Sequence, residues 1–298
     1  TASLDLSGLQ FVSWRSNDIV RINGTSAGDT ITGTSQNDVI DSGGGGLERL
    51  SGGGGNDVIG YDFFRSVELD GGAGNDTVRF DRIPGGLTPQ SVTVDLTAGR
   101  ITESAVGVGT FGLDATNFEN ADFSGSTTHT KRSGTTAANP LIGGAEAETL
   151  TGGLGADTLT GGGGADSFVW NTKQEGGDTI TDWAPGTDKL RFSGAAFAVD
   201  GAFDSVVVAG AEFGGDITGI DLLSLGGFQL TTADEVRFYL DLLTTTADHG
   251  MFVVANNALG NAVLYYTSNA TDGVAGNEVF QIADLGTGTN PLNDFVFI

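Results

Sequence analysis

Cysteine is absent from this chain of 298 residues, and basic residues are few. Without cysteine, neither disulfide bonds nor thiolate metal sites can contribute to the fold. Only 13 lysines and arginines stand against 38 aspartates and glutamates, which gives a formal net charge of -25. A chain this acidic is a poor candidate for binding nucleic acid or an anionic membrane surface. Its apolar runs are too short to cross a bilayer, so membrane insertion is not expected.

Glycine, in contrast, is abundant, with 50 residues, and much of it falls in nonapeptides of the form G-G-x-G-x-D-x-U-x, where U is a large apolar residue. The clearest copies lie in GGLGADTLTGGGGADSFVW, residues 152–170. Glycine permits the positive φ angles of tight turns, and aspartate supplies a hard anionic oxygen that suits Ca2+. The residues around U predict a short strand with one apolar side chain pointing inward. Because one such unit buries very little surface, the units must stack.

The first block of repeats covers residues 24–80. If two nonapeptides complete one coil, alternate repeats share an edge. The sixth residues on one edge are then Asp38, Asp57 and Asp76, and those on the other are Asp29, Glu48 and Val67. We expect metal sites between Asp38 and Asp57 and between Asp57 and Asp76.

A second block covers residues 125–194, where the period of nine resumes at Gly125. Its first two repeats place Thr130 and Asn139 at the sixth position, so we expect these coils to keep the shape with little or no calcium. The next three repeats offer Glu148, Asp157 and Asp166. In the closing segment 176–194, the candidates for a terminal ion are Asp178, Asp182 and Asp188, while the residues expected to cap the apolar end are Ile180, Trp183, Leu190 and Phe192.

The rest of the chain lacks the glycine pattern. Residues 1–23 predict an N-terminal β cap, and residues 81–124 predict a β connector with a strand within 91–99. Residues 195–298 predict a C-terminal β-rich domain with strands at 251–255, 262–267 and 278–285. Thr232 and Glu235 form a capping box for one short helix, residues 232–243. The predicted fold class is therefore all-β: a parallel β-roll, or β-solenoid, with metal in its turns and a C-terminal β-rich cap.

With these in-phase nonapeptides, the chain resembles the RTX (repeats-in-toxin) calcium-binding proteins that Gram-negative bacteria export by type I secretion. The motif resemblance covers residues 24–79 and 125–194. It implies several Ca2+ ions, each held by the acidic residue of a repeat and by carbonyl oxygens of its first and third residues. On this sequence, the carbonyl ligands would belong to Gly33, Ser35, Gly52, Gly54, Gly71, Ala73, Gly143, Ala145, Gly152, Leu154, Gly161 and Gly163.

The resemblance also implies a location and a route of export. Proteins of this family pass through the type I secretion machinery unfolded, directed by an uncleaved C-terminal signal, and the small and apolar tail of this chain is similar to such signals. We therefore expect a secreted protein, extracellular or at the cell surface, that folds on extracellular calcium. The chain begins at Thr1 without methionine or a Sec-type leader, so we expect either a processed product or a fragment of a longer protein.

Two functions remain open, and a third, a ligand-binding adhesin that recognises glycan or ice, has less support because the outward threonines form no consistent row. The first is a non-enzymatic structural protein that assembles with itself, or with cell-surface glycan, in an S-layer, matrix or adhesive layer. The second is the C-terminal secretion and folding module of a larger exported enzyme such as a protease, lipase or epimerase. We expect no catalytic site in these residues. The match of GTSAG (24–28) to G-x-S-x-G lies inside a nonapeptide instead of between a strand and a helix.

Overall fold

The computed structural model describes residues 2–11, 15, 18–44, 46–64, 66–83, 85–184, 186–193, 205–207, 222–229, 251–256, 261–267, 279–287 and 295–297. Two compact units make up the chain. The first contains residues 1–151 and 161–165, and the second contains residues 152–160 and 166–298. The helix expected at 232–243 lies outside the described residues. Within them the one helical element is a short 3-10 turn, η1 (Lys173–Glu175), and no helix is long and apolar enough to span a bilayer.

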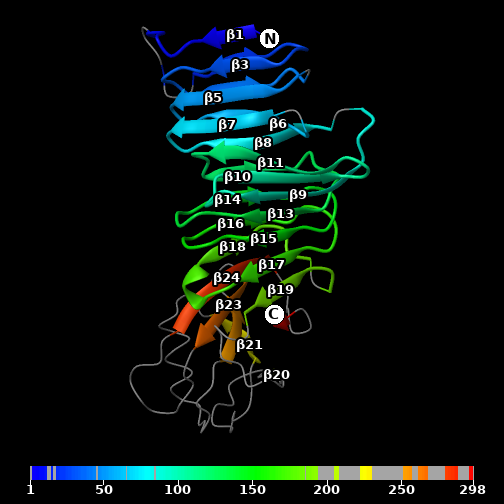
Figure 1. Ribbon diagram of the computed structural model, residues 1–298. Helices are drawn as coiled ribbons and strands as arrows, with labels where there is room; N and C mark the ends of the chain where they lie inside the picture. Colours follow the sequence, from blue (N-terminus) through cyan, green and yellow to red (C-terminus); the bar gives the residue numbers. More distant parts are fainter. Residues whose placement is uncertain are drawn as a thin grey trace. The chain divides into compact units, whose positions relative to one another are not determined.

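In the first unit, successive strands alternate between two parallel sheets, and Figure 1 shows β1, β3, β5 and β7 as successive rungs. The repeat strands of one sheet are β1 (Ala2–Asp5), β3 (Asp29–Thr32), β5 (Glu48–Gly54), β7 (Ser66–Ala73), β13 (Thr130–Ser133) and β15 (Thr149–Thr151). Those of the other are β2 (Val20–Asn23), β4 (Asp38–Asp41), β6 (Val58–Asp62), β8 (Thr77–Arg82), β12 (Asn120–Asp122) and β14 (Pro140–Ile142). The expected parallel β-solenoid is confirmed.

The core of this unit consists of the apolar residues at the eighth place of the nonapeptides. On one sheet Ile31 lies level with Leu50, which lies level with Leu69. On the other, Ile40, Ile59 and Val78 are level with one another and fully buried. Burying one such side chain is worth only about 1.5–3 kcal/mol, whereas ordering the backbone costs roughly 1–2 kcal/mol per residue. A single coil therefore cannot be stable by itself, and the coils must stack.

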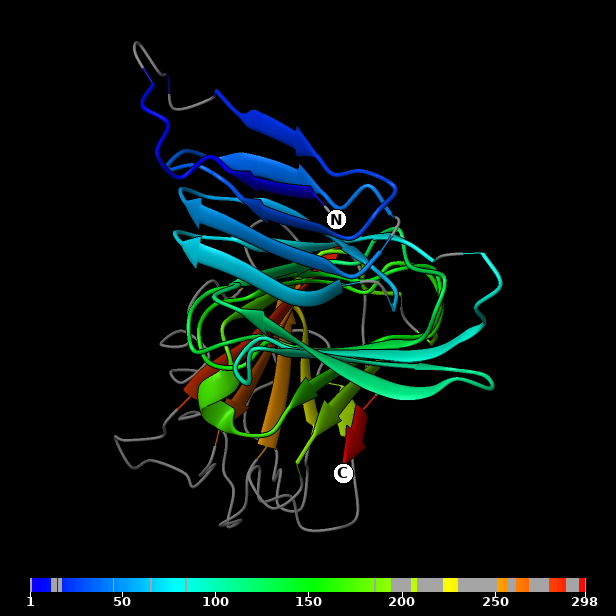
Figure 2. The same ribbon diagram turned by 45° about the horizontal axis from the view of Figure 1, so that its top comes forward.

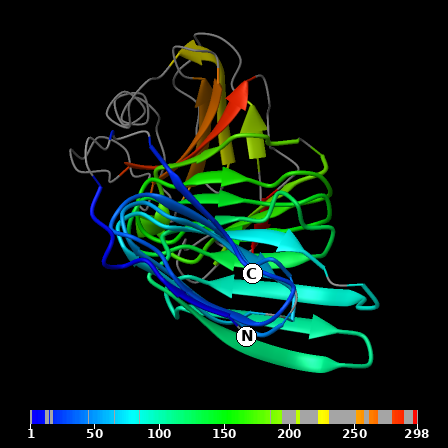
Figure 3. The same ribbon diagram turned by 90° about the horizontal axis from the view of Figure 1, so that it is seen from above.

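The connector between the two repeat blocks is a β structure, as expected. It consists of β9 (Pro89–Asp95), β10 (Arg100–Ala105) and β11 (Gly109–Thr116), which pair antiparallel with one another. β11 adds parallel to β7, and β9 adds parallel to β13. The first sheet thus gains three strands where the second sheet has β12 alone (Figure 2 and Figure 3).

The second unit carries the remaining strands. They are β16 (Thr158–Thr160), β17 (Ser167–Trp170), β18 (Asp178–Ile180), β19 (Lys189–Phe192), β20 (Ser205–Val207), β21 (Leu222–Gln229), β22 (Met251–Asn256), β23 (Asn261–Thr267), β24 (Val279–Thr287) and β25 (Phe295–Phe297). All three strands expected beyond residue 250 are present. β24 pairs parallel with β18, and β25 pairs parallel with β19, so the C-terminal strands extend the sheets of the repeats within this unit.

The residues expected to cap the second block are buried. Ile180, Trp183, Leu190 and Phe192 are all less than 8 % exposed. Trp170 stacks on Phe192 with ring centroids 5.2 Å apart, and Phe168 meets Trp183 at 6.1 Å. Aromatic rings therefore fill the interior where the glycine-rich repeats give way to larger side chains.

Candidate calcium sites at the glycine-rich turns

A ladder of buried carboxylates runs along one edge of the first unit. The backbone N–H of Asp38 donates to Oδ1 of Asp57, and that of Asp57 donates to Oδ1 of Asp76, both at 2.7 Å. All three residues are at most 1 % exposed. The sequence predicted this stack, and the structure confirms it.

The ladder continues one step further than the sequence indicated. The backbone N–H of Asp76 donates to Oε2 of Glu119 at 2.8 Å. Glu119 lies in the connector, outside any glycine repeat, and was not among the predicted site residues. One signal could have found it: it stands two residues before the inward Ala121, the spacing that separates the sixth and eighth residues of a repeat.

The opposite edge corrects one prediction. Its ladder begins as expected, because the backbone N–H of Asp29 donates to Oε2 of Glu48 at 2.7 Å. The next member was predicted to be Val67. However, a β-bulge places Ser66 opposite Glu48 and leaves Val67 as the extra residue. The next member of this edge is therefore the buried Ser66, which offers a hydroxyl group where a repeat would have an acidic side chain.

Oxygen atoms converge on the first glycine of each strong repeat. A Cβ atom on Gly52 would lie 2.2 Å from Oδ2 of Asp57 and 2.4 Å from the carbonyl oxygen of Gly71. A Cβ atom on Gly33 would lie 2.3 Å from both Oδ2 of Asp38 and the carbonyl oxygen of Gly52. Only glycine fits here, and it brings a carboxylate oxygen of one coil next to a carbonyl oxygen of the next coil.

Asp76 repeats this arrangement at the end of the first block. A Cβ atom on Gly71 would lie 2.9 Å from Oδ2 of Asp76 and 2.0 Å from the carbonyl oxygen of Asn117. Asn117 has a positive φ of 57°, which is uncommon for a residue with a side chain. Asn117 and Glu119 of the connector therefore take the places that a glycine and an aspartate hold in a nonapeptide.

Two of these carboxylates have a buried oxygen that finds no hydrogen-bond donor among the described residues: Oδ2 of Asp57 and Oδ2 of Asp76. A buried anionic oxygen without a partner is costly. Calcium coordinates carboxylate and carbonyl oxygens in flexible geometry, so these atoms suit it. No three His, Asp or Glu side chains gather into a metal site in the described part of the chain, so such a cage would rely on carbonyl oxygens.

The electrostatics of the ladder also favour a cation. Burial raises the pKa of Asp57 to about 7, against the lowering effect of the Asp38 N–H, and repulsion from Asp76 and Asp38 adds to the rise. Burial likewise raises the pKa of Asp76 to about 6, with repulsion from Glu119 contributing. The ionised neighbours that raise these pKa values are other carboxylates, so the stacked side chains oppose each other's ionisation.

The second residue of a repeat affects how many hydrogen bonds the carboxylate accepts within its own repeat. In the repeat 33–41 this residue is Thr34, whose N–H donates to Oδ2 of Asp38 at 2.6 Å and whose hydroxyl donates to Oδ1 at 3.1 Å. Thr25 binds Asp29 in the same way, and Thr135 binds the amide oxygen of Asn139 at 2.6 Å. Repeats with glycine at this place, as at Gly53 and Gly72, lack the hydroxyl donor. We did not predict this distinction from the sequence, although the first two residues of each repeat, Gly-Thr or Gly-Gly, are visible in it.

The structure separates the three residues expected to bind a terminal ion. Oδ1 of Asp178 accepts from the N–H of Asp157, and Oδ1 of Asp188 accepts from the N–H of Asp166, both at 3.0 Å. Asp178 is the first residue of β18 and Asp188 directly precedes β19, a strand of the other sheet, while Asp182 lies half-exposed in the turn after β18. Asp178 and Asp188 thus extend two different ladders.

Both oxygens of these two residues already accept hydrogen bonds. Oδ2 of Asp178 accepts from Nε1 of Trp170 at 2.8 Å, and burial raises the pKa of Asp178 to about 8. Oδ2 of Asp188 accepts from the N–H of Ala184 at 2.8 Å. Asp178 and Asp188 therefore resemble Asp38, whose oxygens accept hydrogen bonds from Thr34, more than Asp57 and Asp76, which each keep one oxygen without a described donor.

The predicted carbonyl ligands fall into two groups by exposure. The first-place residues are all buried: Gly33, Gly52, Gly71, Gly143, Gly152 and Gly161. The third-place residues are half-exposed or exposed: Ser35, Gly54, Ala73, Ala145, Leu154 and Gly163. Among the acidic residues, Glu148, Asp157 and Asp166 are buried like those of the first block, and a Cβ atom on Gly152 would again lie 2.2 Å from Oδ2 of Asp157.

A second ladder, of asparagines, runs beside the carboxylates of the first block. The backbone N–H of Asn56 donates to Oδ1 of Asn37 at 2.7 Å, and that of Asn75 donates to Oδ1 of Asn56 at 3.0 Å. Nδ2 of Asn120 then donates to Oδ1 of Asn75 at 2.5 Å. Asn37, Asn56 and Asn75 occupy the fifth place of their repeats, whereas Asn120 belongs to the connector, and the row holds the turns in register without adding charge.

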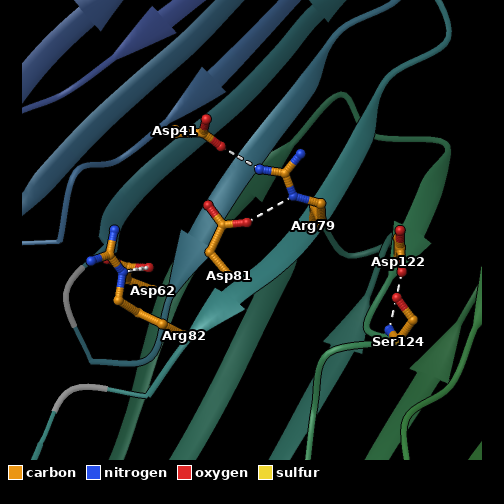
Figure 4. A network of polar contacts seen from close by, with 7 residues as sticks. All are labelled: Asp41, Asp62, Arg79, Asp81, Arg82, Asp122 and Ser124. Carbon is orange, nitrogen blue, oxygen red and sulfur yellow. Dashed lines mark hydrogen bonds and ion pairs between the residues drawn. The ribbon is translucent and has the colours of Figure 1, made fainter.

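The scarce arginines of the first block pair with carboxylates on the strands, away from the ladder. Figure 4 shows Arg79 between Asp41 and Asp81, with Nε 2.7 Å from Oδ1 of Asp81. Nε of Arg82 lies 3.1 Å from Oδ1 of the buried Asp62. The positive charges of Arg79 and Arg82, both on β8, are thus engaged elsewhere, which leaves the open ladder oxygens to an added cation.

Comparison with known families agrees with this geometry. The model of the RTX calcium-binding nonapeptide repeat matches in four copies, at residues 23–59, 68–82 and 133–169. Comparison with curated proteins finds no match. The matched segments contain Asp57, Asp76 and Asp157, whose turns bring carboxylate oxygens against the first glycine of each repeat. The chain therefore carries an RTX calcium-binding repeat region built as a parallel β-solenoid.

Proposed function

We propose that this chain is a secreted structural protein whose repeat region folds on extracellular calcium and then assembles at the cell surface, as in an S-layer, matrix or adhesive layer. The observation that carries the proposal is the pair of buried oxygens on Asp57 and Asp76 without a hydrogen-bond donor among the described residues. When bound, Ca2+ would supply the positive charge that these oxygens lack. Asp57 with the Gly71 carbonyl, and Asp76 with the Asn117 carbonyl, would hold it.

Linkage explains how calcium would control folding. A ligand that binds only the folded chain stabilises it by RT ln(1 + [Ca]/Kd), about 2.7 kcal/mol per site at a hundredfold excess over Kd. Sites of extracellular modules typically have a Kd of about 0.1–1 mM. In a calcium-poor cytosol the stacked carboxylates would repel each other and keep the chain unfolded, as export through a type I system requires. Outside the cell the same residues would drive folding.

An exposed edge supports assembly. β1 is the terminal strand of its sheet and has a described partner, β3, on one side. Leu4 on this strand is 42 % exposed, and Leu9 and Ile19, between β1 and β2 in the sequence, are 48 % and 50 % exposed. A terminal strand with apolar side chains offers both backbone hydrogen bonds and apolar area to a second chain. This edge could stack on another copy, or on a preceding domain of a longer protein.

The test is light scattering during addition of calcium to EGTA-treated protein, with magnesium as the control ion. Large particles should form with calcium only, and Leu4→Lys should prevent their growth while the calcium-dependent circular dichroism signal stays unchanged. Val106→Lys, at a valine that is 59 % exposed in the loop between β10 and β11, is the matched control. Folding without particles, together with a native secreted species much larger than these 298 residues, would favour the alternative that the chain is the secretion and folding module of a larger exported enzyme.

A further inference from the structure

A cavity of about 450 Å³ lies beside the connector of the first unit, next to the edge where Ser66 lies opposite Glu48. Its lining includes Leu47, Phe64, Leu87, Glu103, Val108 and Phe111. Small-molecule sites typically measure roughly 300–1,000 Å³ and combine apolar walls with few polar groups. This cavity fits that description, since Glu103 is the one ionisable side chain among the described residues of its lining.

Glu103 occupies a place that an apolar residue would normally take. Along β10 the inward positions are Ile101, Glu103 and Ala105, all at most 2 % exposed. Its two carboxyl oxygens accept from the backbone N–H of Phe64 at 3.1 and 3.0 Å. Burial raises the pKa of Glu103 to about 7, although the bond from Phe64 opposes the rise. A carboxyl group in such a site is stabilised in its ionised form by a positive partner.

Aromatic and aliphatic side chains surround the mouth of the cavity. Phe64 and Phe111 meet edge to face with ring centroids 5.0 Å apart. Phe111, Leu47 and Val108 are 53 %, 64 % and 47 % exposed, so a large apolar surface faces solvent here. Exposed apolar surface of this kind, with one buried polar group behind it, indicates a binding site. Aromatic faces also attract organic cations.

We propose that this cavity binds a small organic cation with an aromatic or branched apolar body. The ammonium group meets the carboxylate of Glu103, and the body lies against Phe64 and Phe111. Charge complementarity supports this occupant, because a buried carboxylate in an apolar cavity favours a cation over a neutral or anionic molecule of the same shape. A simpler role for Glu103 is to hold the Phe64 backbone, whose φ is 56°. That role needs only a hydrogen-bond acceptor and no charge.

Three matched probes distinguish these roles: 2-phenylethylammonium, 2-phenylethanol and 3-phenylpropionate. Each is titrated by calorimetry into the full chain saturated with calcium. We expect the cation to bind at least about tenfold more tightly than the alcohol, which corresponds to about 1.4 kcal/mol. The carboxylate probe should bind most weakly. Equal binding of all three probes, or no binding of the cation up to its solubility, would overturn the proposal.

Variants test which residue provides the preference. Glu103→Gln keeps an acceptor for the Phe64 N–H but removes the charge, so the cation should lose its advantage over the alcohol. Glu68→Gln is the matched control on β7, where Glu68 pairs with Arg49 at the surface, and it should leave the preference unchanged. If Glu103→Gln fails to fold, Phe111→Ala replaces it and should weaken the cation at least about threefold. The proposal is contradicted if Glu103→Gln still binds the cation as much more tightly than the alcohol as the wild type does, or if Phe111→Ala binds the cation with unchanged affinity.

Discussion

At the scale of single residues, the chemistry of the turns depends on which oxygen atoms remain open. Asp57 gives one oxygen to the neighbouring coil and keeps the other buried without a described donor. Asp38 receives two hydrogen bonds from Thr34 in its own repeat. Acidic residues at equivalent sequence positions therefore differ in how many oxygens they can offer to a cation. We expect calcium to prefer repeats that begin with two glycines.

Asp57→Asn should separate the charge of this residue from its hydrogen bond. The amide oxygen can still accept from the Asp38 N–H, but the anionic ligand is lost. With saturating calcium we expect a loss of about 2 kcal/mol in the free energy of unfolding and a higher calcium midpoint. In EGTA the variant should be no less stable than the wild type, because one repelling charge is gone. Asp114→Asn, on an exposed side chain of β11, is the control, and an unchanged midpoint in Asp57→Asn would refute the assignment.

Gly52→Ala tests the close approach of oxygens at the first place of a repeat. The added methyl group would meet Oδ2 of Asp57 and the backbone of Gly71, neither of which can move aside without breaking the turn. We expect a loss of about 1–3 kcal/mol by urea unfolding in calcium, together with weaker calcium binding. Gly8→Ala is the control, since nothing lies within 4 Å of the new atom. Equal stability of both variants would show that the turn is looser than described.

Glu103 gives the stability of the chain a dependence on pH. Because burial raises its pKa from 4.5 to about 7, the folded chain holds this proton more tightly than the unfolded chain. Its contribution is fully present below about pH 4.5 and is lost as pH rises through 7, by roughly 3 kcal/mol at most. The stability of the wild type minus that of Glu103→Gln should therefore fall between about pH 5 and 8 in urea unfolding at saturating calcium. A difference independent of pH would contradict the described burial.

At the scale of elements, the period of nine predicted most of the repeat strands and their register. It could do so because each repeat carries its own turn, ladder residue and core residue. The bulge at Ser66 and Val67 was missed because a bulge depends on pairing between coils, which one repeat does not record. Glu119 and Asn117 were missed for a similar reason: they complete the ladder from a segment without the glycine pattern. The contact between Trp170 and Asp178 was also missed, because it joins the ends of two successive strands across the non-repeat segment between them.

The loop between β10 and β11 should be the first site of proteolysis in the folded first unit. Val106 and Val108 are 59 % and 47 % exposed there, and Gly107 and Gly109 have positive φ angles. The glycine turns at 52–55 are held by the ladder and should be protected in calcium. Limited digestion with elastase, followed by mass spectrometry, should find cleavage within 105–109 first. Earlier cleavage in the turns, with calcium present, would show that the ladder does not order them.

At the scale of the whole molecule, the net charge of -25 opposes compaction. The ladders concentrate part of this charge in buried rows, where screening by salt is weakest. Monovalent salt should therefore be a poor substitute for calcium, and magnesium should also fail because it needs a stricter octahedral geometry. We therefore expect the chain to remain unfolded or to fold according to the calcium concentration around it.

The most direct measurement is far-UV circular dichroism while EGTA-treated protein is titrated with calcium, in parallel with magnesium. The account predicts a cooperative change from coil to β structure that calcium alone produces, with a higher midpoint in Asp57→Asn. A spectrum that is already fully β in EGTA and does not respond to calcium would contradict the central claim that the buried carboxylate ladders couple folding to calcium.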